Sequence, residues 1–136
     1  MILNWTGFTA ACATFFAVWL GHVTVRKVEY RAPDIRQPMI IAALIGLALE
    51  VAALSSNNLY LSGACGIVGM TALFDALEFR RQSRRVLKGH APANPNNPRH
   101  AKFLAEGHAT TIDLLKREPV GHSSVMLSPE GTKHLS

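Results

Sequence analysis

The chain has 136 residues, of which 49% are hydrophobic, and a formal net charge of +5. This length suits one domain, but the charges are segregated along it. Residues 1–25 contain no Asp, Glu, Lys or Arg, and residues 37–77 contain only Glu50 and Asp75, whereas residues 80–136 hold ten Lys or Arg and four Asp or Glu. Such segregation argues against a uniformly basic nucleic-acid-binding protein.

Three long apolar stretches dominate the first two thirds of the chain, at about 5–25, 38–55 and 59–79. A helix needs about 20 apolar residues to cross the hydrocarbon core of a bilayer. A soluble helical bundle needs a polar face on every helix, and none of these stretches has one. The first lacks the positive leading segment of a cleaved signal peptide. We therefore predict an all-α, integral membrane bundle of three transmembrane helices over residues 1–89, with the third helix extending to about 88.

The basic residues between the stretches indicate the orientation. Residues 26–37 hold four basic and two acidic residues, residues 56–58 hold no charge, and the third stretch leads into five basic residues. The positive-inside rule then places the N-terminus outside and the C-terminal tail in the cytoplasm. Trp5 and Tyr60 fall at the outer interface and Tyr30 at the inner one, where aromatic residues gather. The protein is expected to be a multi-pass protein of the cytoplasmic (inner) membrane.

Five basic residues follow the third stretch on a single helical stripe. They are candidates for contact with anionic lipid of the cytoplasmic leaflet or with a partner protein, since each contributes about 1 kcal/mol near a charged surface. No aromatic residues interleave with them for base stacking, so we expect no nucleic acid. The stripe consists of Arg80, Arg81, Arg84, Arg85 and Lys88.

The remainder of the chain is expected to be a cytoplasmic tail over residues 99–136. Prolines at three-residue spacing in residues 90–98 predict an extended linker. A short amphipathic helix is predicted over about 99–117, weakened by Gly107 in its middle.

Within the spans, Glu50 and Asp75 are candidates for intramembrane polar contacts, because ionisable groups are expensive in lipid. Hydrogen bonding between helices is the simpler interpretation, and proton or ion conduction through Glu50 is the alternative. The two cysteines lie within spans and the six histidines are scattered. We expect no catalytic site, no cofactor and no metal, and hence no enzyme.

The stretch LSGACGIVGMTALFDALEFRRQSRRVLKGHAPANP resembles the closing segment of an uncharacterised family of small bacterial three-span membrane proteins with a Q..RV.KG..P.NP motif. The NWTGF and HVTVRKVEY segments are also similar, so that the resemblance covers about residues 4–99. An aromatic pair is usual in that family where this chain has His90 and Ala91. The matching positions are Asn4, Thr6, Gly7, His22, Lys27, Glu29, Tyr30, Leu61, Ser62, Gly66, Gly69, Glu78, Gln82, Arg85, Val86, Lys88, Gly89, Pro92, Asn94 and Pro95.

The resemblance implies a cluster at the cytoplasmic edge, because the first loop and the exit of the third span share a side. It would be either a stabilising ion-pair group or a site for a lipid headgroup or partner subunit. The cluster comprises Glu29, Tyr30, Glu78, Gln82 and Arg85.

Three functions remain open. The first is a non-catalytic structural or accessory subunit that docks on a larger membrane assembly or on further copies of itself. The second is a holin-like pore, which also combines three spans with a basic inner tail. The third is a small proton- or ion-conducting unit that uses Glu50. A transporter normally shows an internal repeat, and none is found, so the accessory subunit is favoured.

The orientation can be tested by cysteine labelling. In intact cells, Asn57→Cys should react with a membrane-impermeant thiol reagent and Ser136→Cys should not, because the loop between spans two and three is outside and the tail is inside. Labelling of the Ser136 variant but not of the Asn57 variant would reverse the orientation.

Overall fold

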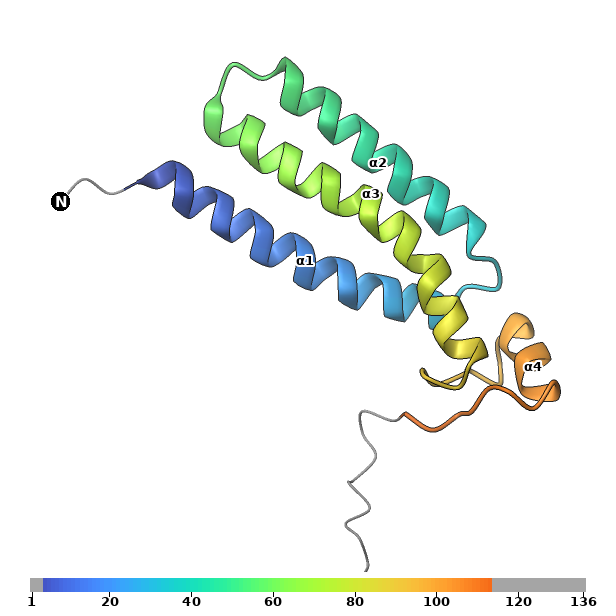
Figure 1. The fold of residues 1–136 in the computed structure, drawn as a ribbon. Helices are drawn as coiled ribbons and strands as arrows, with labels where there is room; N and C mark the ends of the chain where they lie inside the picture. Colours follow the sequence, from blue (N-terminus) through green and yellow to red (C-terminus); the bar gives the residue numbers. More distant parts are fainter. Residues whose placement is uncertain (1–3, 114–136) are drawn as a thin grey trace, which may run out of the picture.

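The structure is a computed structural model, which describes residues 4–113. Three long helices lie side by side, with α2 antiparallel to both α1 and α3, and a short fourth helix follows (Figure 1). Their bounds are α1 Trp5–Arg31, α2 Arg36–Ser55, α3 Leu59–Leu87 and α4 Pro98–Ala105. The predicted all-α class is confirmed.

The three long helices form an open layer with α3 in the middle. Both α1 and α2 pack along α3, and they have almost no contact with each other, as Figure 1 shows. The predicted bundle is therefore two helix pairs that share one helix. Because each outer helix has a neighbour on one side only, most of its apolar side chains remain exposed.

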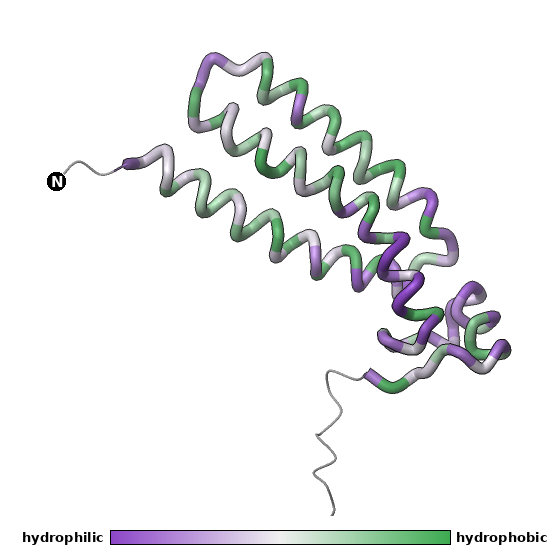
Figure 2. Tube along the Cα trace, viewed as in Figure 1, coloured by the Kyte–Doolittle hydropathy of each residue, from purple (hydrophilic) through white to green (hydrophobic). Residues whose placement is uncertain are grey.

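Apolar surface covers the long helices, and polar residues gather at one end. Figure 2 shows hydrophobic residues along α1, α2 and the first part of α3, with hydrophilic residues concentrated where α3 leads into α4. Large side chains such as Phe15, Leu44 and Val51 are each more than 60% exposed, which in water would be a severe solubility problem. All three helices are long and apolar enough to cross a membrane, as expected of a multi-pass membrane protein.

Glycine allows α2 and α3 to approach each other closely. A Cβ atom at Gly69 of α3 would lie 3.0 Å from the backbone oxygen of Gly46 and 2.9 Å from Oε1 of Glu50, both on α2. Near the turn between α2 and α3, the Ser62 hydroxyl donates to the Ala53 carbonyl oxygen at 2.8 Å. Small residues and a hydroxyl are the means by which helices associate in lipid, where no hydrophobic force pulls them together.

Local signals set the helix ends at the polar end of the layer. α1 runs on past the predicted limit of residue 25 to Arg31, so that its last two turns extend beyond the apolar stretch. α3 ends in a Schellman motif: Gly89 has a φ of +72°, its N–H donates to the Val86 carbonyl, and the His90 N–H donates to the Arg85 carbonyl. A residue with a side chain is strained at such a φ.

The segment after α3 differs from the prediction. Residues 90–98 do not form an extended spacer: the N–H of Ala93 donates to the Thr110 carbonyl at 2.8 Å, which folds this segment against the chain beyond α4. The predicted helix over 99–117 is shorter. α4 ends at Ala105 because Gly107, with a φ of +76°, turns the chain out of the helix. Residues 114–136 lie outside the described part of the chain.

Substituting the glycines tests the close approach of α2 and α3. Gly69→Ala should destabilise the protein by about 1–2 kcal/mol, because the added Cβ meets backbone that cannot move without separating the helices. Gly63→Ala on the same helix is the matched control. Its Cβ meets nothing within 4 Å, so it should be neutral or stabilise by up to about 1 kcal/mol through helix propensity. Unfolding in detergent measures both, and equal effects would contradict this packing.

Candidate functional site

The polar end of the layer is organised around a buried carboxylate. Glu29 lies in the last two turns of α1, and its side chain is only 1% exposed. A carboxylate taken out of water needs charged or hydrogen-bonding partners to offset its lost hydration. Two residues at the start of α4 supply them: Nη1 of Arg99 lies 2.9 Å from Oε1 of Glu29, and Nε2 of His100 lies 3.1 Å from the same atom.

Arg99 joins three helices through its guanidinium group. Nη1 also donates to the Ser83 hydroxyl of α3 at 2.7 Å, and Nη2 donates to the backbone oxygen of Glu29 at 2.8 Å. The ring of Phe103 lies 6.0 Å from the guanidinium carbon. A planar group with donors in a fixed fork suits this set of partners, and a lysine ammonium does not.

His100 is held as a neutral imidazole. Its Nδ1 accepts the backbone N–H of Asn94 at 2.9 Å, so this nitrogen carries no proton, and Nε2 is the nitrogen that donates to Glu29. Burial lowers the pKa of His100, and the nearby Glu29 carboxylate only partly opposes that effect. The ring is 0% exposed and stacks on Phe103, while Tyr30 meets its edge.

Two asparagines satisfy the open end of α1. The last carbonyls of a helix have no partner within the helix. The Asn97 amide donates to the Tyr30 and Ala32 carbonyls at 3.2 and 2.9 Å, and the Asn94 amide donates to the Tyr30 carbonyl at 3.1 Å. Asn97 also accepts the N–H of Arg99, which makes it the N-cap of α4. The asparagines thus cap the end of one helix, and Asn97 also starts another.

A small apolar core completes this region. The buried side chains of Val86, Ala91 and Ala93 pack against partly buried Phe103 and Leu104. We call residues 89–113 the cap, because they fold over the ends of α1 and α3 (Figure 1). The cap is therefore a packed unit with its own polar and apolar contacts.

The cluster predicted at this edge is divided into two groups. Glu29 and Tyr30 face His100 and Arg99, as described above. On α3, Nη1 of Arg85 lies 3.0 Å from Oε1 of Glu78 and 3.2 Å from Oε1 of Gln82. No ion pair links the two groups within residues 4–113. Their division follows from helix geometry, because Arg85 is exposed on the outer side of α3 whereas Glu29 faces inward.

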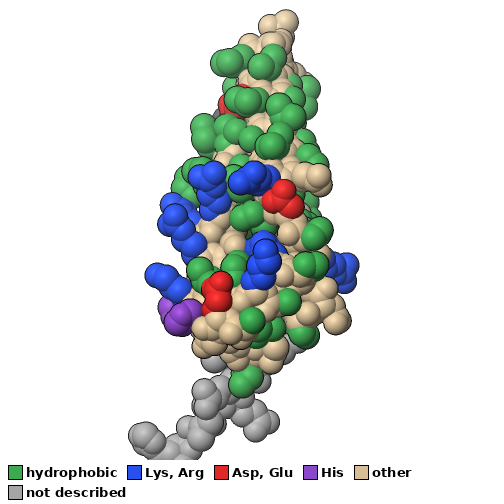
Figure 3. Space-filling model, turned by 90° about the vertical axis from the view of Figure 1, so that its right-hand side faces the viewer, with side chains coloured by type: hydrophobic (Ala, Val, Ile, Leu, Met, Phe, Trp, Pro, Cys, Tyr) green, Lys and Arg blue, Asp and Glu red, His purple; other side chains and the backbone are tan. Residues whose placement is uncertain are grey.

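The predicted basic stripe lies on the exposed surface of α3. All five of its residues, Arg80, Arg81, Arg84, Arg85 and Lys88, are exposed. Arg81 and Arg85 both pair with Glu78, at 3.5 and 3.0 Å, so part of the charge is neutralised. Figure 3 views the molecule from the capped end, where Lys and Arg side chains gather below the apolar part of the helices.

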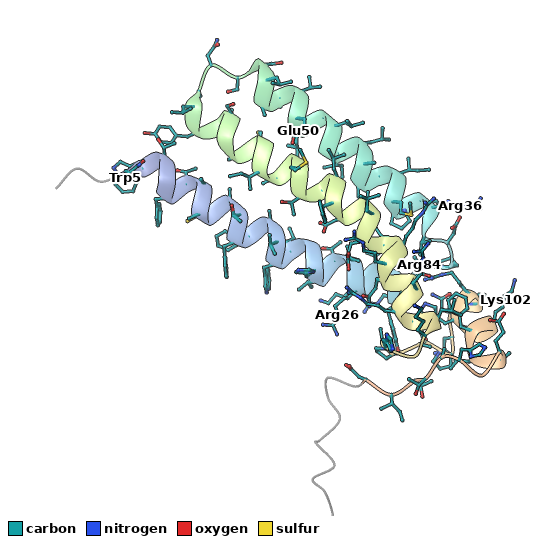
Figure 4. All side chains as sticks on the ribbon, viewed as in Figure 1. Trp5, Arg26, Arg36, Glu50, Arg84 and Lys102 are labelled. Carbon is teal, nitrogen blue, oxygen red and sulfur yellow. The ribbon has the colours of Figure 1, made fainter. Side chains whose placement is uncertain are left out.

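The two acidic residues within the spans lie at different helix pairs. Glu50 lies between α2 and α3 (Figure 4), packed against Gly69, and its Oε1 is buried without a hydrogen-bond partner in the described part of the chain. Asp75 of α3 lies against Gly21 of α1 and lines a cavity of about 220 Å³ together with His22. The two carboxyl groups are thus on opposite sides of α3, and each packs on a glycine of the neighbouring helix.

Comparison with protein families identifies the family of this chain. The family model described as a domain of unknown function, DUF4491, matches residues 4–97. The chain belongs to this family. No curated protein and no solved structure matches it. In this DUF4491 protein the match spans the three long helices and ends at Asn97, so Arg99 and His100 lie just beyond the matched region.

Sequence reasoning placed Glu29 at this edge but missed its partners. The sequence analysis places Arg99 and His100 at the start of the amphipathic helix predicted in the tail, and Asn94 and Asn97 in the linker, with no contact to Glu29. One local signal was available: Asn97 followed by Pro98 is a helix start, with an N-cap residue before proline at the first helical position. It indicates a helix at residue 98, although it does not indicate where that helix docks.

Removing the guanidinium group tests the site. Arg99→Gln should destabilise the protein by about 3 kcal/mol, because Glu29 keeps its burial and loses its charged partner. Arg81→Gln removes the same charge from an exposed pair and should change stability by less than about 1 kcal/mol. Thermal unfolding in detergent gives the size of the effect, and amide hydrogen exchange should rise in residues 89–113 of the Arg99 variant only. Equal losses of stability in the two variants would show that the buried ion pair contributes no more than the exposed one.

Proposed function

We propose that this chain is a non-catalytic accessory subunit of a larger membrane assembly. In this proposal it lies in the bacterial cytoplasmic membrane with its N-terminus outside, and the cap faces the cytoplasm. The cap is the docking element, anionic lipid surrounds the basic stripe on α3, and the Q..RV.KG..P.NP segment of the family supplies the turn that starts the cap. No nucleic acid and no cofactor takes part.

The observation that carries this proposal is the rigid attachment of the cap to the spans. A flexible tether needs no buried ion pair, and a buried ion pair adds little net stability compared with apolar packing. The ion pair instead fixes the position of the cap relative to α1 and α3, because the guanidinium group of Arg99 must contact Glu29 and Ser83 at the same time. A cap that is held rigidly above the membrane presents a preorganised surface, which lowers the entropic cost of binding a specific partner.

The charges of the ends support the orientation. Arg26, Arg36, Arg84 and Lys102 all lie toward the capped end in Figure 4, whereas Trp5 lies at the opposite end. Basic residues favour the cytoplasmic side, and tryptophan favours an interface. The open layer of helices supports docking as well, since the outer sides of α1 and α2 have no protein neighbour in the described chain.

Glu50 fits a role in helix packing within this proposal. Its carboxyl group occupies the space that Gly69 leaves open, so the two residues form one close contact between α2 and α3. A conducting unit would need a chain of polar groups across the membrane, and Glu50 and Asp75 are separated by the body of α3.

A comparative pull-down tests the proposal. Affinity-tagged full-length protein is extracted in mild detergent and its partners are quantified by mass spectrometry, with Arg99→Gln plus Asn97→Ala as the cap-release variant and Arg81→Gln as the control. A membrane-protein partner should be recovered in stoichiometric amount with the native chain and with the control. The cap-release variant, at equal level in the membrane, should lose most of it.

Three results would overturn the proposal. If the cap-release variant retains the partner fully, the cap is not the docking element. If no partner is found and expression makes cells leaky to small dyes, the holin-like pore is the better account. A proton flux that Glu50→Gln abolishes would favour the conducting unit instead.

A further inference from the structure

A cavity of about 500 Å³ lies between α1, α3 and the cap. This is within the size range of ligand pockets in proteins. Its α1 wall includes His22, Arg26, Lys27 and Arg31. Its α3 wall includes Gln82. The cavity adjoins the Glu29 ion-pair group, and it contains no residue of the basic stripe on α3.

The cavity is positively charged. Arg26, Lys27 and Arg31 are exposed, and none of them forms an ion pair within residues 4–113. Glu29 also lines the cavity, but its charge is matched by Arg99. Asp113 lines it too and has an interaction of its own in the protein. Three unmatched cations therefore face at most one further carboxylate, which favours an anionic occupant.

Gln82 provides a hydrogen-bond donor at the wall of the cavity. Its side chain is 7% exposed, and its Oε1 is engaged as an acceptor from Arg85. No hydrogen bond from its amide nitrogen is found among the described residues, and this nitrogen is not one of the buried unpaired atoms there. Because Gln82 lines the cavity, its solvent-accessible N–H groups can donate to an oxygen of a bound anion.

The position of the cavity along the helices points to the source of the anion. The charge-free part of α1 ends at Val25, and that of α3 ends before Glu78 apart from Asp75. Arg26 and Gln82 therefore lie where the apolar spans give way to the cap, which is the depth of phospholipid headgroups. Basic pockets between transmembrane helices on the cytoplasmic side bind the headgroups of anionic lipids, and arginine pairs with phosphate oxygens in a bidentate manner.

We propose that this cavity binds the phosphate group of an anionic phospholipid. Arg26, Lys27 and Arg31 hold the phosphate oxygens, and the Gln82 amide nitrogen donates from the α3 side. The inference rests on the membrane placement given above, but not on docking to a partner protein.

Native mass spectrometry of the purified full-length chain tests this site. The detergent-solubilised protein is incubated with phosphatidylglycerol, with phosphatidylcholine or with inorganic phosphate. The native chain should retain one phosphatidylglycerol per chain and little phosphatidylcholine. Replacing Arg26, Lys27 and Arg31 together with Gln should weaken that retention about tenfold or more.

Two further variants make the result specific. Replacing Arg80, Arg81 and Arg84 with Gln removes the same charge from α3 outside the cavity and should change retention less than about twofold. Gln82→Glu keeps the acceptor for Arg85 but places a carboxylate in the wall, and should weaken retention without any change to α1. Thermal unfolding without lipid shows whether each variant is folded.

Three outcomes would overturn the inference. Equal weakening by the two triple variants would mean a diffuse attraction to basic surface. Equal retention of phosphatidylcholine would show that the net charge of the lipid does not matter. Inorganic phosphate that displaces the lipid and binds with the same dependence on α1 would make free phosphate, and not a lipid, the ligand. Because the isolated chain is used, each result is independent of the partner pull-down.

Discussion

The buried carboxylate of Glu29 is the constraint on which the capped end of this structure depends. Moving such a group out of water costs several kcal/mol unless partners replace the lost hydration. Arg99 supplies charge and His100 supplies a neutral donor, and both come from the same two-residue segment at the start of α4. Burial of Glu29 therefore fixes the position of α4. In that position Phe103 and Leu104 of α4 pack against Val86 and Ala93.

Side chains of residues 94–99 also donate hydrogen bonds to the last carbonyl groups of α1. A helix that ends under a folded cap cannot leave its last carbonyls to water. Arg99, Asn97 and Asn94 donate to the carbonyls of Glu29, Tyr30 and Ala32. Neutralising the charge of Glu29 and hydrogen-bonding the last carbonyls of α1 thus require the same docking position for α4. Such agreement between independent requirements is typical of a sequence that specifies one fold.

Much of the fold follows from simple sequence patterns, and the site follows less readily. The three spans are evident from the length of the apolar stretches, and the glycines at 46 and 69 are small residues where close packing is needed. The arrangement of α3 between α1 and α2 has no such signal, because all three helices carry small residues. The family resemblance draws attention to Glu29, but a long-range ion pair leaves no periodic pattern, so nothing in the sequence links Arg99 and His100, at the start of the predicted tail helix, to that residue. The helix over 99–117 was overestimated because Gly107 was treated as a weak point and not as an end.

The separation of Glu29 from its partners has a consequence for how the protein assembles. Arg99 and His100 follow Glu29 by 70 and 71 residues, and all of α2 and α3 lies between them. During synthesis, the carboxylate and the last carbonyls of α1 therefore have only water as a hydrogen-bond partner until both later helices and α4 have been made. The partners can reach it only on the same side of the bilayer, a condition that α2 and α3 meet by crossing in opposite directions. A chain in which only one of these two helices crossed could not close the cap.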